Sequence, residues 1–421
     1  MSRVVVTGLG CIGAVGANVA STWESVVSGK SGIEPASSWD ATGWQFRLAG
    51  EIKDYQPRKL VADRKLLKVI SRQDVIGLNA VDQAIQHSGM LAHRDSLNEA
   101  TSFNDRTGVF VGSPGTKYRQ QHDYLSALAE SGDDISKFGN AALEQVHPMW
   151  LLRTLPNNVL AYTGIGHGFK GANENVTAHG ISGAQAIAEA RRYVRDGEID
   201  RAVVVGYDSV SEAEAMVYYG AIGLLSANAL KPFDRDRDGT ILGEGAGAIV
   251  LESLDAARER GATIYGEVLG CSVTSEGGIL SVSDDGSGLV RAIRASLADG
   301  GRHPEEVGMI TAHANGSRPS DASEALAIGE VFGDSGPPVT GFKWSLGHTV
   351  AASGVLESVL TLLSLRERRV PGIATLENLA PECAGIRASA SEQEPSSALG
   401  LVMTRGFAGL NSCILLSADA D

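Results

Sequence analysis

The chain has 421 residues, of which 43% are hydrophobic and 20% charged, so it can bury a sizeable core. Its 51 glycines and 5% aromatic residues favour a layered α/β protein with tight turns and close backbone packing. The formal net charge of -14 argues against nucleic acid or an anionic membrane as the main partner, because both attract clustered Lys and Arg.

The cysteines and the N-terminus indicate the compartment. Four cysteines lie far apart without metal-type spacing, so we expect buried free thiols in a reducing environment and no metal site: Cys11, Cys271, Cys383 and Cys413. The first residues lack the features of a signal peptide, and no apolar run approaches the ~20 residues that a membrane span requires. We therefore expect a cytoplasmic protein that does not enter a membrane.

Short apolar runs flanked by glycine predict buried strands. They lie at residues 4–8, 108–112, 202–206, 246–251, 309–313 and 398–403. Two polar stretches, residues 91–102 and 120–145, are interrupted by Gly, Asp and Asn and predict excursions at the periphery.

Two buried helices are predicted at residues 182–194 and 353–365, each opening with Ser-Gly and carrying one apolar face. Their similar positions suggest an internal duplication, with a join near residues 251–261. We expect one continuous globular unit of two related α/β halves, residues 1–255 and residues 256–421.

The most informative stretch is residues 231–247, a charged, turn-rich segment that runs into glycines and an apolar strand. Its glycine spacing fits neither a Walker loop nor a dinucleotide fingerprint, so no phosphate cofactor is implied. Taken from its residues alone, the stretch is a salt-bridged loop packed on a core strand.

The same stretch resembles the signature of β-ketoacyl-acyl-carrier-protein synthases. The likeness lies in residues 232–234 (PFD), 237–239 (RDG) and 243–247 (GEGAG), and it extends to residues 7–10, 312–321, 343–348 and 406–411. It covers nearly the whole chain. The resemblance implies a thiolase-like fold, in which two duplicated α/β halves form five layers, αβαβα, around two central helices.

Synthases of this family use a cysteine thiolate, donors for an enolate and an oxyanion hole. The cysteine precedes the first buried helix, whose N-terminus lowers its pKa. Aligning residues 182–187 with that helix places Gly180 at the cysteine position, which implies that no acyl-enzyme forms. His179 and Ser182 are poor substitutes, because they are expected to point elsewhere and Ser needs a base. His179 is expected to be buried and hydrogen-bonded, or to line a tunnel or the partner interface.

The resemblance gives roles to three further residues that the chain retains. His313 and His348 match the histidines that donate to the malonyl thioester carbonyl, and Lys343 matches the lysine that orders the site. In this chain they form either a structural relic or a site that still decarboxylates malonyl thioesters without condensing them.

Residues 404–411 resemble the glycine-rich hairpin that carries the oxyanion donor and the gating phenylalanine, and Phe407 within it is a predicted tunnel or gate residue. Arg405 replaces the aromatic gate, and its guanidinium would either fill the apolar acyl path or form a salt bridge. The basic and aromatic residues Lys117, Tyr118 and Arg119 lie where relatives often reach across a dimer interface, so they are a predicted partner contact, with an exposed loop as the alternative.

The leading hypothesis is a chain length factor, the non-catalytic subunit of a type II polyketide ketosynthase. Such a subunit pairs with an active ketosynthase as a heterodimer, shapes the acyl tunnel that sets polyketide or polyene chain length, and meets the acyl carrier protein through the complex. No cofactor is implied. Known factors usually carry glutamine at the cysteine position and often lose the first histidine, so Gly180 and His313 depart from that pattern.

Two alternatives remain at this point. The chain could be a malonyl-carrier decarboxylase or divergent acyltransferase that uses His313, His348 and Lys343. It could also be a ketosynthase in which Gly180 has replaced the active-site cysteine. The sequence leaves open the product class, the starter unit and the identity of the ketosynthase partner.

Overall fold

The computed structural model describes residues 2–115, 122–132, 134–210, 212–277, 282–333 and 335–419. Through this part of the chain runs a mixed sheet in the order β11-β10-β9-β12-β13-β8-β1-β7-β6-β4-β5, beside a small β2-β3 pair. The strand bounds are β1 (Val4–Gly13), β2 (Ile33–Pro35), β3 (Leu48–Gly50), β4 (Thr107–Gly112), β5 (Asn173–Val176), β6 (Arg201–Ser209), β7 (Glu244–Ser253), β8 (Gly266–Ser275), β9 (Met309–Thr311), β10 (Pro338–Thr340), β11 (Arg387–Ala388), β12 (Leu399–Gly406) and β13 (Leu410–Ser417). The six predicted strands correspond to β1, β4, β6, β7, β9 and β12, although β9 ends at Thr311, before His313.

The sheet repeats one connectivity. Its first part has the order β5-β4-β6-β7-β1, and its second part, without the short edge strand β11, has the order β10-β9-β12-β13-β8. When the strands of each part are numbered along the chain, both orders read 3-2-4-5-1. Within the sheet, the two parts pair through β1 and β8, where Val5 and Val6 lie opposite Glu267 and Gly266. This repeat confirms the predicted fold class of two related α/β halves. The division after residue 255 stays a prediction, because helix α13 (Leu254–Glu259) runs across it.

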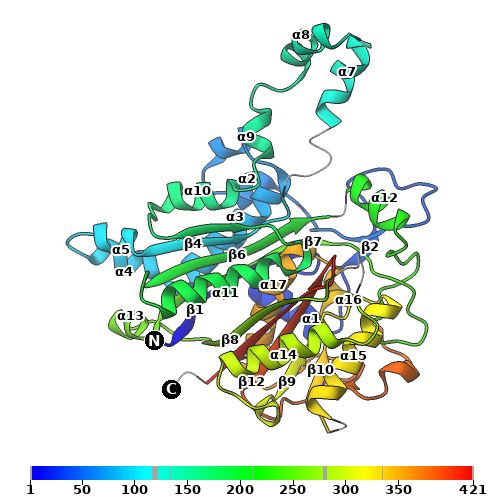
Figure 1. Ribbon diagram of the computed structural model, residues 1–421. Coiled ribbons are helices and arrows are strands. Elements are labelled where there is room, and N and C mark those ends of the chain that lie inside the picture. The colour runs from blue at the N-terminus through cyan, green and yellow to red at the C-terminus, as the bar shows by residue number, and fades with distance from the viewer. Residues whose placement is uncertain are drawn as a thin grey trace.

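The helices form layers on and between the two parts (Figure 1). Helix α3 (Arg72–Ser88) covers β1, β6 and β7, while α14 (Ser287–Asp299) covers β8 and β13 and contacts α15 (Arg318–Phe332). Between them lie α11 (Ser182–Arg195) on β4 and β6, and α17 (Ser353–Arg366) on β7 and β12. The remaining α-helices are α1 (Val19–Val27), α2 (Pro57–Leu60), α4 (Met90–Ser96), α5 (Thr101–Asp105), α7 (Leu125–Ser131), α8 (Ile135–Gln145), α9 (Trp150–Thr154), α10 (Asn158–His167), α12 (Ala213–Ala221) and α16 (Lys343–Leu346).

The two central helices touch backbone to backbone at the Ser-Gly start that the sequence singled out. A Cβ added to Gly354 of α17 would lie 2.5 Å from the backbone nitrogen of Ala184, and one added to Gly183 of α11 would lie 2.8 Å from the carbonyl oxygen of Ala351. Real Cβ atoms do not approach this closely, so glycine is required at both positions. The contact brings the N-termini of both helices to one place.

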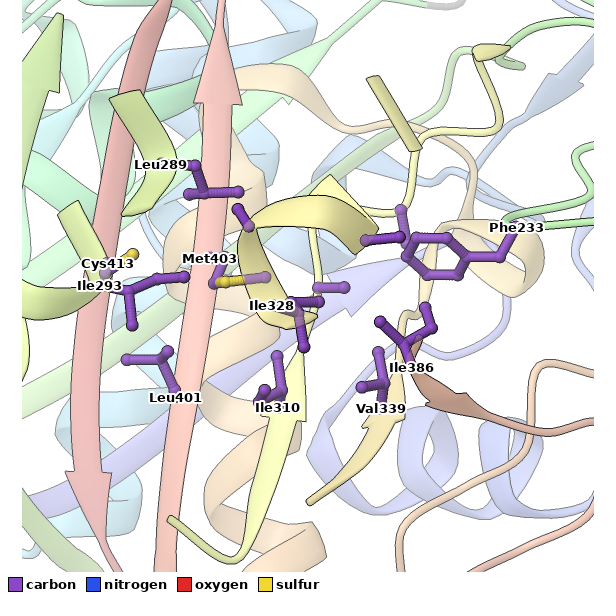
Figure 2. Packing of buried hydrophobic residues seen from close by; sticks show 14 of the residues in the cluster. Phe233, Leu289, Ile293, Ile310, Ile328, Val339, Ile386, Leu401, Met403 and Cys413 are labelled. Atoms are coloured by element: carbon purple, nitrogen blue, oxygen red, sulfur yellow. The ribbon is translucent and has the colours of Figure 1, made fainter. Parts of the chain in front are cut away.

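The second part of the sheet has its own apolar core. Figure 2 shows Ile310, Leu401, Met403 and Cys413 from three strands packing together with side chains from α14 and α15. Phe233, which belongs to the informative stretch of residues 231–247, lies at the edge of this cluster and is fully buried. That stretch is therefore anchored in the core of the second half.

The loop of residues 231–247 also ties the two halves together by polar contacts. The Phe233 amide donates to Asp321 Oδ2 at 2.7 Å, and the Gly316 amide donates to Asp321 Oδ1 at 3.1 Å. The buried Arg237 donates to Glu382 Oε1 at 2.8 Å. The prediction of a salt-bridged loop on a core strand agrees with these contacts, and the loop fixes the chain next to His313.

Two excursions leave this body. Helices α4 and α5 lie at one edge, and the α7–α8 helical hairpin projects well away from the sheet (Figure 1). The projecting helices expose apolar side chains, with Ile135 78% and Leu143 84% exposed. The predicted partner contact of Lys117, Tyr118 and Arg119 falls outside the described residues. No helix in the described ranges combines the length and apolar character of a membrane span.

Candidate active site

A cavity of about 280 Å³ lies beside the N-termini of the two central helices. Three histidines line it: His179, His313 and His348. Its walls are mainly apolar and include Tyr218, Tyr219, Ile222, Leu224 and Phe407. Of the residues predicted for the site, the structure thus brings His179, His313, His348, Arg405 and Phe407 together, whereas Gly180 and Lys343 do not line this cavity.

His179 occupies a sharp turn between β5 and α11. Its φ is +51°, in the left-handed region that non-glycine residues rarely adopt. The turn is held by the hydroxyl of Ser182, which donates to His179 O at 2.7 Å and accepts from the Ala178 amide at 2.9 Å. Ser182 is buried and engaged in this way, so it is not placed to act as a nucleophile. Backbone strain of this kind collects at functional sites.

Gly180 faces away from the cavity. A Cβ built on Gly180 would overlap the carbonyl oxygen of Arg405 in β12. The prediction that Gly180 marks the place of a catalytic side chain therefore conflicts with the backbone, because a side chain at 180 would enter the hairpin instead of the cavity. The side chain that reaches the cavity from this turn is that of His179.

The hydrogen bonds of His179 fix its tautomer. The Phe407 amide donates to Nδ1 at 3.4 Å, and Nε2 lies 2.7 Å from the hydroxyl of Tyr219. A nitrogen that accepts an N–H bond carries no proton, so the neutral ring carries its proton on Nε2. The Phe407 ring lies 4.2 Å from the imidazole, between ring centroids. His179 is thus hydrogen-bonded and lines the cavity, two of the roles considered from the sequence.

His313 and His348 are arranged as a pair of donors. Their ring centroids lie 5.1 Å apart, and each Nδ1 accepts a backbone N–H bond, from Arg405 at 3.2 Å and from Val350 at 3.3 Å. Burial, reinforced by the positive charge of Lys343, holds the pKa of both imidazoles well below the usual range. Both rings are therefore neutral, with the proton on Nε2, where it can be donated to a ligand oxygen.

Lys343 lies behind the histidines and not in the cavity. Its Nζ is 2.6 Å from Glu357 Oε1, and both side chains are buried. Burial raises the pKa of Glu357 to about 7, and the lysine opposes this rise. The lysine contributes positive potential next to His313 and His348 and is itself held in place by the carboxylate.

Of the two roles predicted for the Arg405 guanidinium, filling the acyl path or forming a salt bridge, the structure shows the salt bridge. Its buried guanidinium pairs with Glu276 at 3.2 Å and also donates to Asn411 Oδ1 at 3.0 Å. Further bonds go to Ser320 O at 3.0 Å and Ser323 Oγ at 2.9 Å. The side chain at the predicted gate therefore ties the β12–β13 hairpin to the segment that follows β8.

A second cavity of about 200 Å³ lies on the other side of His179, Tyr219 and Phe407. Pro114, Asp208, Val210 and Ala351 are among its other lining residues, while His179, Tyr218, Tyr219 and Phe407 line both cavities. The ring centroids of Tyr219 and Phe407 lie 5.7 Å apart. These side chains form a wall between two spaces.

No cysteine among the described residues lines either cavity. Burial raises the pKa of Cys11, Cys271 and Cys383 to about 12 and that of Cys413 as well, so all four thiols are protonated at neutral pH. None of these four cysteines is therefore a candidate for the thiolate that would form an acyl-enzyme.

Comparison with known proteins places these features in a class. A repeated α/β fold of this kind is found in a crystal structure described as a β-ketoacyl synthase from Burkholderia phymatum, with a TM-score of 0.88 at 22% identity over the whole of both chains. The profile of the β-ketoacyl synthase N-terminal domain matches residues 1–257, and that of the C-terminal domain matches residues 265–377. The chain belongs to the β-ketoacyl synthase family.

Individual relatives resemble the chain along most of its length. It is 31% identical to a 3-oxoacyl-[acyl-carrier-protein] synthase 2 of Synechocystis sp., covering 90% of this chain and 89% of that protein. It is 29% identical to the protein of the same name from Coxiella burnetii, covering 100% and 99%. A solved structure described as the ishigamide ketosynthase/chain length factor matches the whole of both chains at 27% identity with a TM-score of 0.88.

Sequence reasoning missed Tyr219, which lines both cavities and contacts His179. The residue lies in α12, outside every motif that the sequence singled out, so no local signal connected it with a histidine 40 positions earlier in the chain. Asn315 was noted only as part of a motif, yet it also lines the larger cavity.

Proposed function

We propose that this chain is a non-catalytic ketosynthase-like subunit, a chain length factor, that pairs with an active β-ketoacyl synthase. The single observation that carries the proposal is His179, an imidazole in the strained turn where the family's nucleophile is expected. We assign the family's cysteine position to residue 179, one position before the residue that the alignment indicated, because only the side chain at 179 reaches the cavity. The chain then has no sulfur at the point of acyl transfer.

The hydrogen bond from the Phe407 amide supports a loss of condensing activity. The resemblance makes this hairpin the source of the oxyanion donor, and here His179 Nδ1 accepts the N–H at 3.4 Å. An oxyanion would have to displace the imidazole, which is also bonded to Tyr219.

Pairing with a ketosynthase is supported by the relative described as a ketosynthase/chain length factor, which matches this chain from end to end. Strand β5 lies at the end of the sheet order and pairs only with β4 in the described part of the chain, so its other edge can accept a strand from a partner. We place the partner at this edge and keep Lys117, Tyr118 and Arg119 as predicted partner contacts from the sequence. An acyl carrier protein would meet the complex through the catalytic subunit.

Copurification tests the pairing. We expect the full chain, coexpressed with a catalytic ketosynthase from the same source, to elute with it as a heterodimer, and the isolated chain to form no covalent adduct with an acyl thioester. A variant combining Lys117→Glu, Tyr118→Ala and Arg119→Glu should weaken copurification, whereas Arg294→Glu on the outer helix α14 should not. A stable homodimer that ignores every ketosynthase offered would contradict the proposal.

A second candidate is favoured by one observation, the pair of neutral donor histidines. His313 and His348 can stabilise the enolate that forms when a malonyl thioester loses carbon dioxide, and this step needs no nucleophile. The chain would then be a malonyl-thioester decarboxylase, alone or within the heterodimer. A cysteine at position 180 gains no support, since its Cβ would overlap the Arg405 carbonyl.

A further inference from the structure

We infer that the N-terminus of helix α15 is a carboxylate-binding site inside the larger cavity, which takes a short acyl ligand with a terminal carboxylate. The inference goes beyond the proposed function, because it concerns what this chain binds and requires neither a partner subunit nor a decarboxylation. It follows from donors in the first turn of α15 that lie at the cavity and have no partner in the described part of the chain.

The first turn of α15 forms part of the cavity wall. Ser317 is the N-cap residue of the helix, and Ser317, Pro319 and Ser320 all line the cavity. A serine at an N-cap usually accepts a hydrogen bond from the second or third amide of its helix, but the Ser317 side chain makes no such bond. Pro319 has no N–H, so the uncapped amide is that of Ser320, and no backbone acceptor for it is found among the described residues.

Two hydroxyl groups lie beside this amide. Ser317 is 7% exposed and Ser320 is 3% exposed, so both residues are more than nine-tenths buried. The Ser320 Oγ has no hydrogen-bond partner within the described ranges. A buried hydroxyl in this state is destabilising until a polar group reaches it. A carboxylate suits the turn, because its two oxygens accept several hydrogen bonds and donate none.

The local charges favour an anion at this turn. A helix N-terminus carries a partial positive charge on its unpaired amides and commonly binds carboxylate or phosphate groups. The Arg405 guanidinium lies against the same turn, because its Nη1 donates to Ser320 O at 3.0 Å and to Ser323 Oγ at 2.9 Å. The turn is therefore held in place by a cation.

Three buried carboxyl groups oppose an anion here, and each is paired or hydrogen-bonded. Glu276 forms the salt bridge with Arg405. Asp321 lies 3.7 Å from the Arg237 guanidinium, and burial raises its pKa to about 7, so part of it is uncharged at neutral pH. Glu324 accepts two backbone N–H bonds, and burial raises its pKa as well. A ligand carboxylate would thus meet the donors of α15 without an uncompensated anion beside them.

The two histidines at the other side of the cavity set the length of the ligand. His313 and His348 line the same cavity and offer Nε2–H donors for a carbonyl oxygen. Arg405 connects the two places, because its amide donates to His313 Nδ1 and its side chain donates to Ser320 O. The cavity of about 280 Å³ is small beside typical ligand pockets of about 300–1,000 Å³. A malonyl group, with a carbonyl and a carboxylate on one methylene, matches this arrangement.

Binding to the purified full chain tests the site. The probes are the malonyl and acetyl amides of N-acetylethylenediamine, which differ only in the terminal carboxylate and contain nitrogen in place of a reactive thioester sulfur. In isothermal titration calorimetry the malonyl amide should bind on the order of tenfold tighter than the acetyl amide. Ser320→Ala should weaken the malonyl amide several-fold, and Ser320→Asp should abolish the preference, because its own carboxylate would occupy the site.

The matched control is Ser287→Asp, the same change in the first turn of α14, whose residues do not line the cavity. It should keep the preference for the malonyl amide. An acidic residue in the first turn is favourable to a helix, so thermal unfolding should show that both Asp variants are folded. Should Ser320→Asp not fold, Ser320→Ala decides, since an unchanged malonyl affinity in it would overturn the inference.

Equal affinity of the wild type for the two amides, or no binding of either, would equally overturn it, as would a malonyl preference that survives in folded Ser320→Asp. None of these results bears on the pairing with a ketosynthase, which copurification judges.

Discussion

At the scale of residues, the proposed function depends on one side chain at a strained position. His179 has a positive φ, a conformation that is costly on its own, and three contacts hold it there: its carbonyl accepts from Ser182, its Nδ1 accepts from the Phe407 amide, and its Nε2 lies 2.7 Å from the Tyr219 hydroxyl. A glycine follows it only because the Arg405 carbonyl leaves no space for a Cβ. The two adjacent residues therefore have opposite roles, one facing the cavity and one making room for the hairpin.

Two cysteine substitutions test this assignment. His179→Cys should give a folded protein whose thiol is alkylated by iodoacetamide, because the residue lines a cavity at a helix N-terminus, which favours the thiolate. Gly180→Cys should lower the unfolding free energy by about 1–3 kcal/mol or more through overpacking against β12. Labelling followed by mass spectrometry, together with denaturant unfolding, provides the measurement. Rapid labelling at 180 in a stable protein would reverse the assignment.

The buried histidine pair makes stability depend on pH. His313 and His348 have a lowered pKa in the folded state, so below about pH 6.5 the unfolded chain binds protons that the folded chain does not. Each histidine should then lower the unfolding free energy by up to about 1.4 kcal/mol per pH unit on acidification. Above about pH 6.5 the two histidines cause no such loss of unfolding free energy.

Buried carboxyl groups with a raised pKa make the protein more stable on acidification, which opposes the effect of the two histidines. A variant without the histidines separates the two contributions. A double variant with His313→Asn and His348→Asn keeps an acceptor for the backbone amides but cannot be protonated. Its stability relative to wild type should rise steadily from about pH 7 to about pH 5 in urea unfolding curves. A difference that stays constant with pH would show that the two histidines have the same pKa in the folded and the unfolded chain.

At the scale of elements, the site depends on how closely α11 and α17 approach. Gly183 and Gly354 let the backbones touch, and this contact brings the turn at His179 and the loop at His348 to the same cavity. The sequence identified both helices and their Ser-Gly starts correctly, because an apolar face with period 3.6 is a strong local signal. It could not show which atoms the glycines face.

Glycine substitutions with a matched control test the contact. Gly354→Ala should lower the unfolding free energy by about 1–3 kcal/mol, because the new methyl group would lie 2.5 Å from the Ala184 nitrogen. Gly329→Ala, inside α15 with nothing within 4 Å of its added Cβ, should instead stabilise the protein by about 0.4–1 kcal/mol. Thermal and urea unfolding measure both. Equal effects of the two changes would contradict a tight helix contact.

At the scale of the whole molecule, the two halves share a core. One apolar cluster contains Val204 and Ile249 from the first half together with Val359, Val402 and Ile414 from the second. The repeat that the sequence suggested is therefore a repeat of topology and not of independent units. Residues 231–247, tied to Asp321 and Glu382, add polar contacts between the halves.

Expression of the halves tests this interdependence. Residues 1–255 and 256–421 made separately should be insoluble or lack cooperative unfolding, because each exposes its side of the shared cluster. The intact chain should unfold in one transition by fluorescence and by circular dichroism. A half that folds alone would show that the shared cluster is not required for folding.

The sequence predicted the fold class, most core strands and the three histidines, because patterning and family motifs are local. The sequence pointed to Gly180, whereas the side chain that reaches the cavity is that of His179, because a Cβ at 180 would overlap the Arg405 carbonyl, and this contact exists only in the folded chain. Tyr219 was missed for a similar reason, since its contact with His179 joins two elements that only the folded chain brings together. The salt bridge of Arg405 was one of two stated options, and only the position of Glu276 decides between them.

The projecting α7–α8 hairpin affects how the isolated chain would behave in solution. Its helices expose Leu125, Ile135 and Leu143 to water, and the hairpin projects away from the sheet that could cover them (Figure 1). Apolar side chains gathered on a protruding arm favour self-association when nothing else is bound to them. On a phenyl column, the lone polypeptide should be retained longer than a truncated form that lacks this hairpin, and detergent or glycerol should improve its recovery during purification.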